Sequence, residues 1–335
     1  MNREVASGEL WAELGRVVRL PGSPRSRAAW TWLELGAVPV AAARAGVEVL
    51  HSPANFGALA GPFARVLTLH DVLFRRHPEL LTRAMRLGTE LLLPPAVRRA
   101  HGLITVSEAS RDDIVELLGV PAERVDVVPN GWTPPREAGD AARARALLGA
   151  GDRPVVLSVA SDLPQKNLSL LVDALALLGQ PDRPLVVLAG HGTDSGALAE
   201  RAAGAEVADD LRPLGSVDAT TLEDLYAAAA MVITTTRAEG FGLPVLEALG
   251  RGVAVAASDL PVLREVAGDC ALWFAPGDAA GAAAALRHAA EGHPVLARLG
   301  GAGRSRARAF TWHAAAGRTW ETYERALARR RPQRG

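Results

Sequence analysis

Short apolar runs rich in Val, Ile and Leu recur along this 335-residue sequence, and they alternate with Ala/Leu-rich stretches of helical spacing. Runs that are apolar throughout are typical of strands covered on both faces, and their alternation with helices indicates βα units around parallel sheets. The pattern therefore predicts an α/β chain with strands near residues 47–51, 65–70, 103–107, 125–128, 155–160, 185–189, 231–235 and 253–257.

The chain is longer than one usual domain, so we expect two. Clustered Pro, Gly and Asp interrupt structure at residues 132–152, where WTPPREAGD and GAGDRP frame a short helix. Four predicted strands precede this segment and four follow it. We therefore expect one domain over residues 1–135 and a second over residues 150–310.

Composition excludes several classes of protein. The 37 basic and 37 acidic residues balance, which removes the broad attraction that drives nucleic-acid binding and favours a small ligand. Cys270 is the single cysteine, so no intramolecular disulfide can form. The opening MNREVASGELWAEL lacks the apolar core of a signal peptide, and no apolar run reaches the ~18 residues of a spanning helix. A cytoplasmic location is expected.

Polar residues follow nearly every predicted strand, at the point where the strand ends. Open α/β sheets bind ligands at the carboxyl ends of their strands, so these residues are expected to share one rim. They include His51, His70, Asp71, Ser107, Ser161 and the loops at 190–192 and 236–240. No HExxH motif, Cys/His ligand spacing or aspartate pair indicates a metal site.

The segment RAEGFGLPVLE, residues 237–247, carries the richest chemistry. Gly240 and Gly242 allow backbone to approach a ligand closely, and Pro244 suits the first turn of a helix, whose free N–H groups bind phosphate. Glu239 and Glu247 flank this corner, and carboxylates accept hydrogen bonds from pairs of sugar hydroxyls. A bare pair of glutamates is a weak signal by itself, but the loop between them strengthens it.

The stretch EGFGLPVLEALGRGVAVAASDLPVLREVAGD resembles the signature region of glycosyltransferase family 4, a group of retaining enzymes with the GT-B fold. The resemblance extends in the expected order from residue 65 to about 328, through ITVSEASRDDIVELLGVPAERVDVVPNG, SVASDLPQKNLSLLVDALALL, LGSVDATTLEDLYAAA and RAFTWHAAAGRTWETYERAL. It implies two Rossmann-like parallel-sheet domains facing a central cleft. A C-terminal helix at 313–329 would cross back to complete the N-terminal domain.

The resemblance also assigns residues to a donor site. Glu239 would bind hydroxyls of the donor sugar, Glu247 would hold the ribose diol, and Lys166, the only lysine in the chain, would neutralise the diphosphate. Ala160-Ser161 stand where the family commonly has Gly-Arg, which puts Ser161 beside the donor. Backbone facing the sugar and phosphate would come from Gly240, Phe241, Gly242 and Leu243.

The N-terminal half contributes further candidates. His70 resembles the histidine that this family offers to the donor sugar, and with Lys166 and Glu239 it completes the expected catalytic set. His51 and Asp71 are acceptor-side candidates because they also follow strands, although a structural role for either histidine stays open. Ser107 is expected to cap a helix over residues 108–118.

The implied function is retaining, metal-independent transfer of a mannose-, rhamnose- or glucose-like hexosyl group. The donor would be a nucleotide-diphosphate sugar and the acceptor a glycan or lipid-linked molecule in polysaccharide biosynthesis, with no cofactor. Residues 1–46 show no counterpart of the family's first strand and Gly-rich turn, so a nucleotide-sugar-binding homologue without turnover stays open. A glycoside hydrolase using Glu239 and Glu247 is the remaining alternative.

Residues 72–99 carry six Arg and two Glu with apolar residues between them. An ordinary exposed helix explains this composition, and so does peripheral contact with an anionic membrane at its inner face. Both explanations stay open at the level of sequence.

Overall fold

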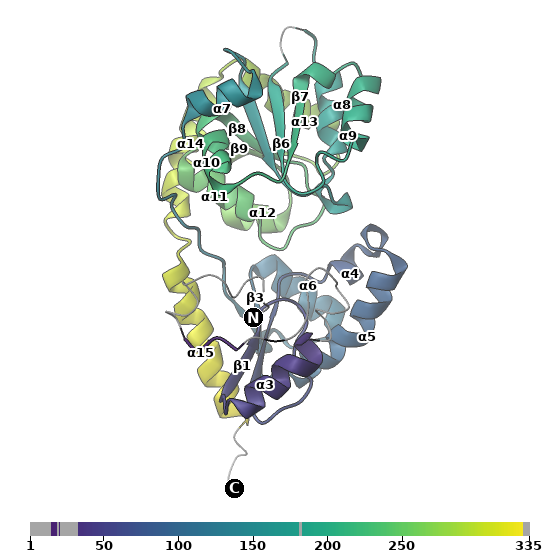
Figure 1. The fold of residues 1–335 in the computed structure, drawn as a ribbon, viewed down its shortest axis with the longest axis vertical. Coiled ribbons are helices and arrows are strands. Elements are labelled where there is room, and N and C mark those ends of the chain that lie inside the picture. Colours follow the sequence, from purple (N-terminus) through teal and green to yellow (C-terminus); the bar gives the residue numbers. More distant parts are fainter. Residues whose placement is uncertain (1–14, 19, 21–32, 181–182, 331–335) are drawn as a thin grey trace. The chain divides into compact units, whose positions relative to one another are not determined.

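A computed structural model describes residues 15–18, 20, 33–180 and 183–330. The chain divides into two compact units, one formed by Met1–Pro129 with Ala316–Gly335 and the other by Asn130–Ala315 (Figure 1). Each unit is built on its own parallel sheet. The α/β class that the alternating pattern predicts is therefore confirmed.

Among its described residues, the first unit contains a four-stranded sheet in the order β1-β2-β3-β4, with all neighbours parallel. Its strands are β1 (Val49–Ser52), β2 (Ala64–Leu69), β3 (Gly102–Thr105) and β4 (Val125–Val127). Its helices are η1 (Leu33–Ala37), α3 (Val38–Arg44), α4 (Leu73–Arg76), η2 (Pro78–Leu80), α5 (Arg83–Arg99), α6 (Glu108–Leu118) and η3 (Ala122–Arg124), and α15 (Trp312–Arg330) returns to this unit from residue 316.

Helix α6 has the bounds that the sequence predicts. The Ser107 side chain accepts a hydrogen bond from the Ser110 backbone N–H at 3.1 Å, which satisfies one free donor of the first turn. Gly119 ends the helix with φ of 65°, a left-handed conformation that glycine adopts without strain. Ser107 therefore acts as the expected cap.

Helix α15 packs on the sheet of the first unit. Thr322 donates a hydrogen bond to the Asp126 carboxylate at 2.8 Å, and Arg325 forms an ion pair with the same carboxylate at 3.0 Å. A Cβ on Gly102 would lie 2.9 Å from the Thr322 methyl carbon, so glycine in β3 allows the helix to approach closely. The predicted C-terminal helix on the N-terminal sheet is present.

The second unit contains a six-stranded parallel sheet in the order β10-β9-β8-β5-β6-β7. Its strands are β5 (Val155–Val159), β6 (Leu185–Ala189), β7 (Leu211–Gly215), β8 (Ala229–Thr234), β9 (Ala254–Ser258) and β10 (Ala271–Phe274). Its helices are α7 (Ala141–Leu148), η4 (Pro164–Lys166), α8 (Ser169–Ala176), α9 (Ala197–Gly204), η5 (Ala208–Asp210), α10 (Ala219–Ala228), α11 (Leu243–Arg251), α12 (Pro261–Ala267), α13 (Ala279–Ala290) and α14 (Pro294–Ala307).

Strands β6 and β9 are buried at every position because helices cover both faces of this sheet (Figure 1). All eight strands that the sequence predicts are present, with ends that agree to within two residues. The edge strands β7 and β10 were not predicted. Strand β7 contains Arg212 and Pro213, and an edge strand tolerates both because one side needs no partner.

The strand order reverses at β5. Strands β6 and β7 are added on one side of β5, whereas β8, β9 and β10 are added on the other. The loops that follow β5 and β8 therefore leave the sheet at neighbouring positions and diverge toward opposite faces. Such a switch point opens a crevice at the carboxyl ends of the two strands, where open α/β sheets bind ligands.

Candidate functional site

The loops after β5 and β8 are joined by hydrogen bonds. The Thr235 hydroxyl donates to the Lys166 carbonyl at 3.0 Å and to the Asn167 carbonyl at 3.1 Å. The Gln165 carbonyl accepts from the backbone N–H of Arg237 at 2.7 Å. Asn167 takes a left-handed φ of 51°, which asparagine tolerates better than most residues. These contacts hold the turn that carries Lys166 against the loop that carries Glu239.

Lys166 and Glu239 meet at this junction. The Lys166 Nζ lies 2.5 Å from Glu239 Oε2, and their side chains are 22% and 19% exposed. A half-buried ammonium–carboxylate pair is stronger than a fully exposed one because less water screens it. The two residues that the sequence assigns to the diphosphate and the donor sugar are therefore in direct contact at the switch point.

The amino end of α11 faces the same loop. Gly242 precedes the helix with φ of 95° and makes no side-chain cap, and Pro244 in the first turn has no N–H. The Val245 and Leu246 N–H groups donate to the Gly242 carbonyl at 3.0 and 3.1 Å, so the Leu243 N–H is the first-turn donor that has no acceptor within the helix. A Cβ on Gly242 would lie 2.5 Å from the Leu263 Cδ2 atom, so only glycine fits there. Uncapped N–H groups at a helix amino end form a ready site for an anion such as phosphate.

The side chains of Phe241 and Leu243 differ in their exposure to solvent. The Phe241 side chain is 5% exposed and packs edge to face on Phe310, with ring centroids 6.0 Å apart. Leu243 is 40% exposed. Phe241 is thus a core residue through its ring, and only its backbone is suited to a ligand. Gly240 is buried beside it.

Glu247 lies in the second turn of α11 and is paired with a tyrosine. The Tyr226 hydroxyl donates to Glu247 Oε2 at 2.9 Å. Within the described part of the chain, the Glu247 carboxylate therefore pairs with Tyr226 and not with Lys166 or Glu239. The sequence reasoning missed Tyr226, although a tyrosine in the Ala-rich stretch LYAAAA is a visible departure from composition.

Ser161 follows β5, and its carbonyl accepts from the Leu163 N–H at 2.9 Å in the turn that leads to Lys166. The next residue, Asp162, donates its N–H to the His191 carbonyl at 2.8 Å, which ties this turn to the loop after β6. Thr235 and Thr236 are buried. Thr236 belongs to the loop 236–240 that was expected at the rim, whereas Thr235 was expected only as the last residue of a strand and its role in holding the Lys166 turn was missed.

His70 and Asp71 follow β2 in the first unit. The His70 Nε2 donates to the Pro53 carbonyl at 2.8 Å, which fixes Nε2 as the protonated ring nitrogen because a carbonyl only accepts. The Asp71 carboxylate accepts from the Leu73 N–H at 3.0 Å, at the start of α4. Both side chains are thus held by backbone groups of the first unit.

His51 uses both ring nitrogens within the first unit. Its Nδ1 lies 2.8 Å from the Tyr323 hydroxyl on α15 and its Nε2 lies 2.8 Å from the Thr68 hydroxyl on β2. Burial, with a smaller contribution from His70, lowers the pKa of His51 to about 4. The ring is therefore neutral at neutral pH, and these contacts favour a structural role over an acceptor-side one.

None of the described helices is long and apolar enough to cross a membrane. Within the described ranges, no group of three or more His, Cys, Asp or Glu side chains is arranged to hold a metal ion.

Solved structures with this fold are numerous. A sucrose-phosphate synthase from Thermosynechococcus elongatus superposes with a TM-score of 0.74 at 23% identity, over 93% of this chain and 83% of that one. HepE of Anabaena, solved in complex with UDP, superposes with a TM-score of 0.71 at 21% identity, over 94% and 88%. These likenesses show the fold, which is GT-B-like, with two parallel sheets and a C-terminal helix on the first of them.

Among curated proteins, an MMP alpha-(1->4)-mannosyltransferase of Mycolicibacterium hassiacum is 30% identical over 236 residues, which are 69% of this chain and 56% of that protein. O-antigen chain mannosyltransferase B of Escherichia coli is 28% identical over 271 residues, 77% of this chain and 70% of that protein. The match thus spans little more than half the length of the first relative. Residues 142–306 match the family Glycosyl transferases group 1, and residues 3–134 match Glycosyltransferase Family 4. The chain therefore belongs to the group 1/family 4 glycosyltransferases.

Proposed function

We propose that this chain transfers a hexosyl group from a nucleotide-diphosphate sugar to a glycan or lipid-linked acceptor, with retention of configuration at the anomeric carbon. The Lys166–Glu239 contact at the switch point carries this proposal. It brings a cation suited to a diphosphate next to an anion suited to sugar hydroxyls, beside the uncapped amino end of α11. Membership in this family and the named mannosyltransferase relatives support the same reaction class.

In the proposed reaction the bond between the anomeric carbon and the diphosphate oxygen breaks, and the acceptor oxygen forms the new bond on the same face. The acceptor proton passes to the leaving phosphate oxygen. Lys166 and the N–H groups of α11 stabilise the negative charge that builds up on the diphosphate. Glu239 orients the transferred sugar through its hydroxyls, and His70 is proposed as a further catalytic residue. No protein nucleophile and no metal ion is required.

The reaction is tested by incubating the full chain with the nucleotide sugars UDP-glucose, GDP-mannose and dTDP-rhamnose and measuring release of nucleoside diphosphate. Glycan and lipid-linked acceptors are supplied in parallel, with and without EDTA. Acceptor-dependent release that survives EDTA supports the proposal. Release that EDTA abolishes contradicts metal independence, and hydrolysis of simple glycosides without nucleotide would indicate the hydrolase alternative.

A nucleotide-binding homologue without turnover is separated from the enzyme by the same samples. Ligand that binds only the folded state raises the thermal midpoint, so a nucleotide diphosphate is expected to stabilise the chain in either case. Stabilisation without acceptor-dependent release would favour the non-catalytic homologue. Absence of stabilisation by any nucleotide would contradict both.

We propose that the transfer to the acceptor takes place while the chain is in peripheral contact with an anionic membrane. Leu87 and Leu91 lie one turn apart on α5 and are 64% and 73% exposed, with Arg83 and Arg86 near them in sequence. Vesicle flotation with anionic and with zwitterionic lipid tests this surface. Replacing Leu87 and Leu91 with Ser is expected to reduce binding to the anionic vesicles, and equal binding to both lipids would contradict the proposal.

A further inference from the structure

Tyr226 is one of two tyrosines in the chain, and its ring is 1% exposed within the second unit. Its hydroxyl donates to Glu247 Oε2 at 2.9 Å. Burial, with the negative charge of Glu247, raises the pKa of Tyr226 well above its usual range. The hydroxyl is therefore protonated at every working pH and acts as a permanent donor to the carboxylate.

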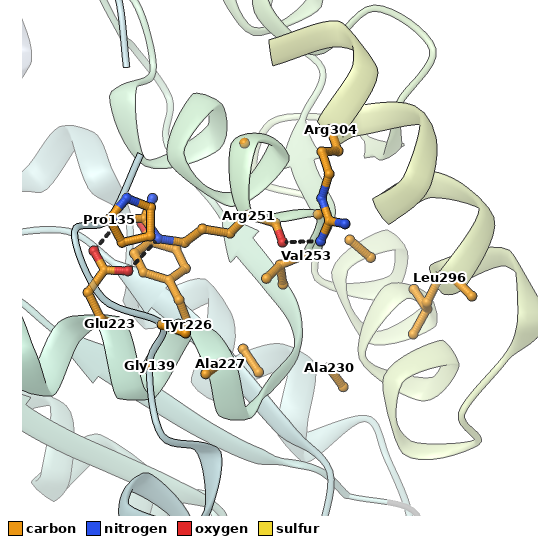
Figure 2. A pocket seen from close by; sticks show the side chains of 16 residues that line it. Pro135, Gly139, Glu223, Tyr226, Ala227, Ala230, Arg251, Val253, Leu296 and Arg304 are labelled. Atoms are coloured by element: carbon orange, nitrogen blue, oxygen red, sulfur yellow. Dashed lines mark hydrogen bonds and ion pairs between the residues drawn. The ribbon is translucent and has the colours of Figure 1, made fainter. Parts of the chain in front are cut away.

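Arg251 holds the tyrosine from the other side. Its guanidinium carbon lies 4.4 Å from the centre of the Tyr226 ring, and its Nη1 donates to the Glu247 carbonyl at 3.0 Å. Its Nε donates to Glu223 Oε2 at 2.8 Å, and a second contact makes this pair bidentate. Figure 2 shows Arg251 extended across Tyr226 toward Glu223.

These side chains line one wall of a cavity of about 560 Å³. Ala229 and Ala254, which begin β8 and β9, also line it, so the cavity lies at the amino ends of these strands, opposite the switch-point rim. Because the wall faces a cavity, Arg251 and Glu223 are held by hydrogen bonds rather than by packing on every side. The loss of one of these hydrogen bonds is therefore expected to change the position of the Glu247 side chain.

We propose that Tyr226 is a positioning residue for Glu247, and that the network Tyr226–Arg251–Glu223 sets the preference of the site for ribose over 2′-deoxyribose. This inference rests on the proposed function and on the role that the family resemblance implies for Glu247, which is to accept hydrogen bonds from the ribose diol. A glutamate left unpaired samples several rotamers and must be ordered when a ligand binds. A glutamate whose Oε2 already accepts a hydrogen bond is ordered before the ligand binds. It can therefore accept from two adjacent hydroxyls without losing further rotamer freedom.

The test compares the affinity of the full chain for UDP, GDP and ADP with its affinity for their 2′-deoxy forms by calorimetry. The wild-type chain is expected to bind the preferred ribonucleotide about tenfold more tightly than its deoxy form, the size of one hydrogen bond to a charged group. Tyr226→Phe removes one oxygen and is expected to reduce this ratio to about threefold or less, through weaker ribonucleotide binding. An unchanged ratio in Tyr226→Phe overturns the inference.

Tyr323→Phe is the matched control, because the other tyrosine donates or accepts at His51 in the first unit and has no contact with Glu247. It is expected to leave the ratio unchanged. Arg251→Lys keeps the charge but loses the planar fork and stacking, so it is also expected to lower the ratio. In the double variant Tyr226→Phe/Glu247→Gln, the ratio should equal that of Glu247→Gln alone, and a further additive loss would overturn the positioning role.

Different results contradict the proposed function and the role of Tyr226. A wild-type chain that binds no nucleoside diphosphate contradicts the proposed function and the inference together. A wild-type chain that binds ribo and deoxy forms equally contradicts only the role of Glu247 and Tyr226, and leaves the diphosphate site at Lys166 standing.

Discussion

Lys166 Nζ and Glu239 Oε2 lie 2.5 Å apart although 73 positions separate the two residues in the sequence. Each follows a strand that borders the reversal of strand order, β5 for Lys166 and β8 for Glu239. The Lys166 ammonium, which is suited to a diphosphate, and the Glu239 carboxylate, which is suited to sugar hydroxyls, thus lie in the same crevice. Their separate contributions can be measured.

Replacing Lys166 with Ala removes the cation that faces the leaving diphosphate. We expect kcat to fall by about 10²- to 10³-fold, the range seen when one preorganised stabiliser of transition-state charge is lost. Affinity for the free nucleoside diphosphate should fall as well. Arg201→Ala removes a surface cation that pairs with Asp173 in the same unit and should leave both quantities unchanged. Wild-type turnover in Lys166→Ala would remove this residue from the mechanism.

Glu239→Gln tests the sugar rather than the diphosphate. The amide keeps the shape but is a weaker acceptor for hydroxyls, so kcat/KM should fall by about 10- to 100-fold. Affinity for the free nucleoside diphosphate, which lacks the sugar, should change much less than in Lys166→Ala. The measurement is steady-state kinetics combined with calorimetry, and Asp173→Asn is the control. Equal losses for sugar nucleotide and free diphosphate would assign Glu239 to the phosphate side.

Gly242→Ala tests the corner at the start of α11. Residue 242 has φ of 95°, and the added Cβ would lie 2.5 Å from Leu263 Cδ2, so we expect a loss of about 1–3 kcal/mol in stability together with weaker nucleotide binding. Gly301→Ala in α14 meets no atom within 4 Å and should stabilise the chain by about 0.5–1 kcal/mol. Thermal unfolding and calorimetry of both variants check this, and equal effects would contradict the steric argument.

The lowered pKa of His51 predicts that the free energy of unfolding decreases in acid. Its pKa is lowered to about 4 in the folded chain, against about 6.5 when unfolded. Between these values the unfolded chain binds the extra proton, so stability is complete above pH 6.5 and is lost as the pH falls toward 4. The full loss from this residue is about 3 kcal/mol.

The measurement is the thermal midpoint of wild type and His51→Gln at pH 7.5 and 5.0. Glutamine cannot take up the proton, so the variant should lose less stability on acidification, although it starts lower at pH 7.5 because the fit between Thr68 and Tyr323 is imperfect. A pH dependence of His51→Gln identical to wild type would show that other groups carry the acid effect.

Much of the secondary structure of this protein could be predicted from local sequence patterns. The inner strands of both sheets were predicted, because residues covered on both faces leave a nearly continuous Val/Ile/Leu signal that needs no knowledge of neighbours. The cap at Ser107 and the start of α11 at Pro244 were also readable, since capping and helix initiation depend on residues within one turn. Strand β7 was missed because Arg212 and Pro213 interrupt its apolar run, and β10 was missed because its four residues, ALWF, include no Val or Ile.

The sequence by itself determined the fold class, the family resemblance and the order of Lys166, Glu239 and Glu247 along the chain. Only the tertiary structure decided their partners: Glu239 for Lys166, Tyr226 for Glu247, and Tyr323 with Thr68 for His51. Each partner comes from a different strand, loop or helix, between 17 and 272 positions away. Hydrogen bonds and ion pairs act over a few ångströms, so such pairs exist only after the sheet order has brought distant segments together.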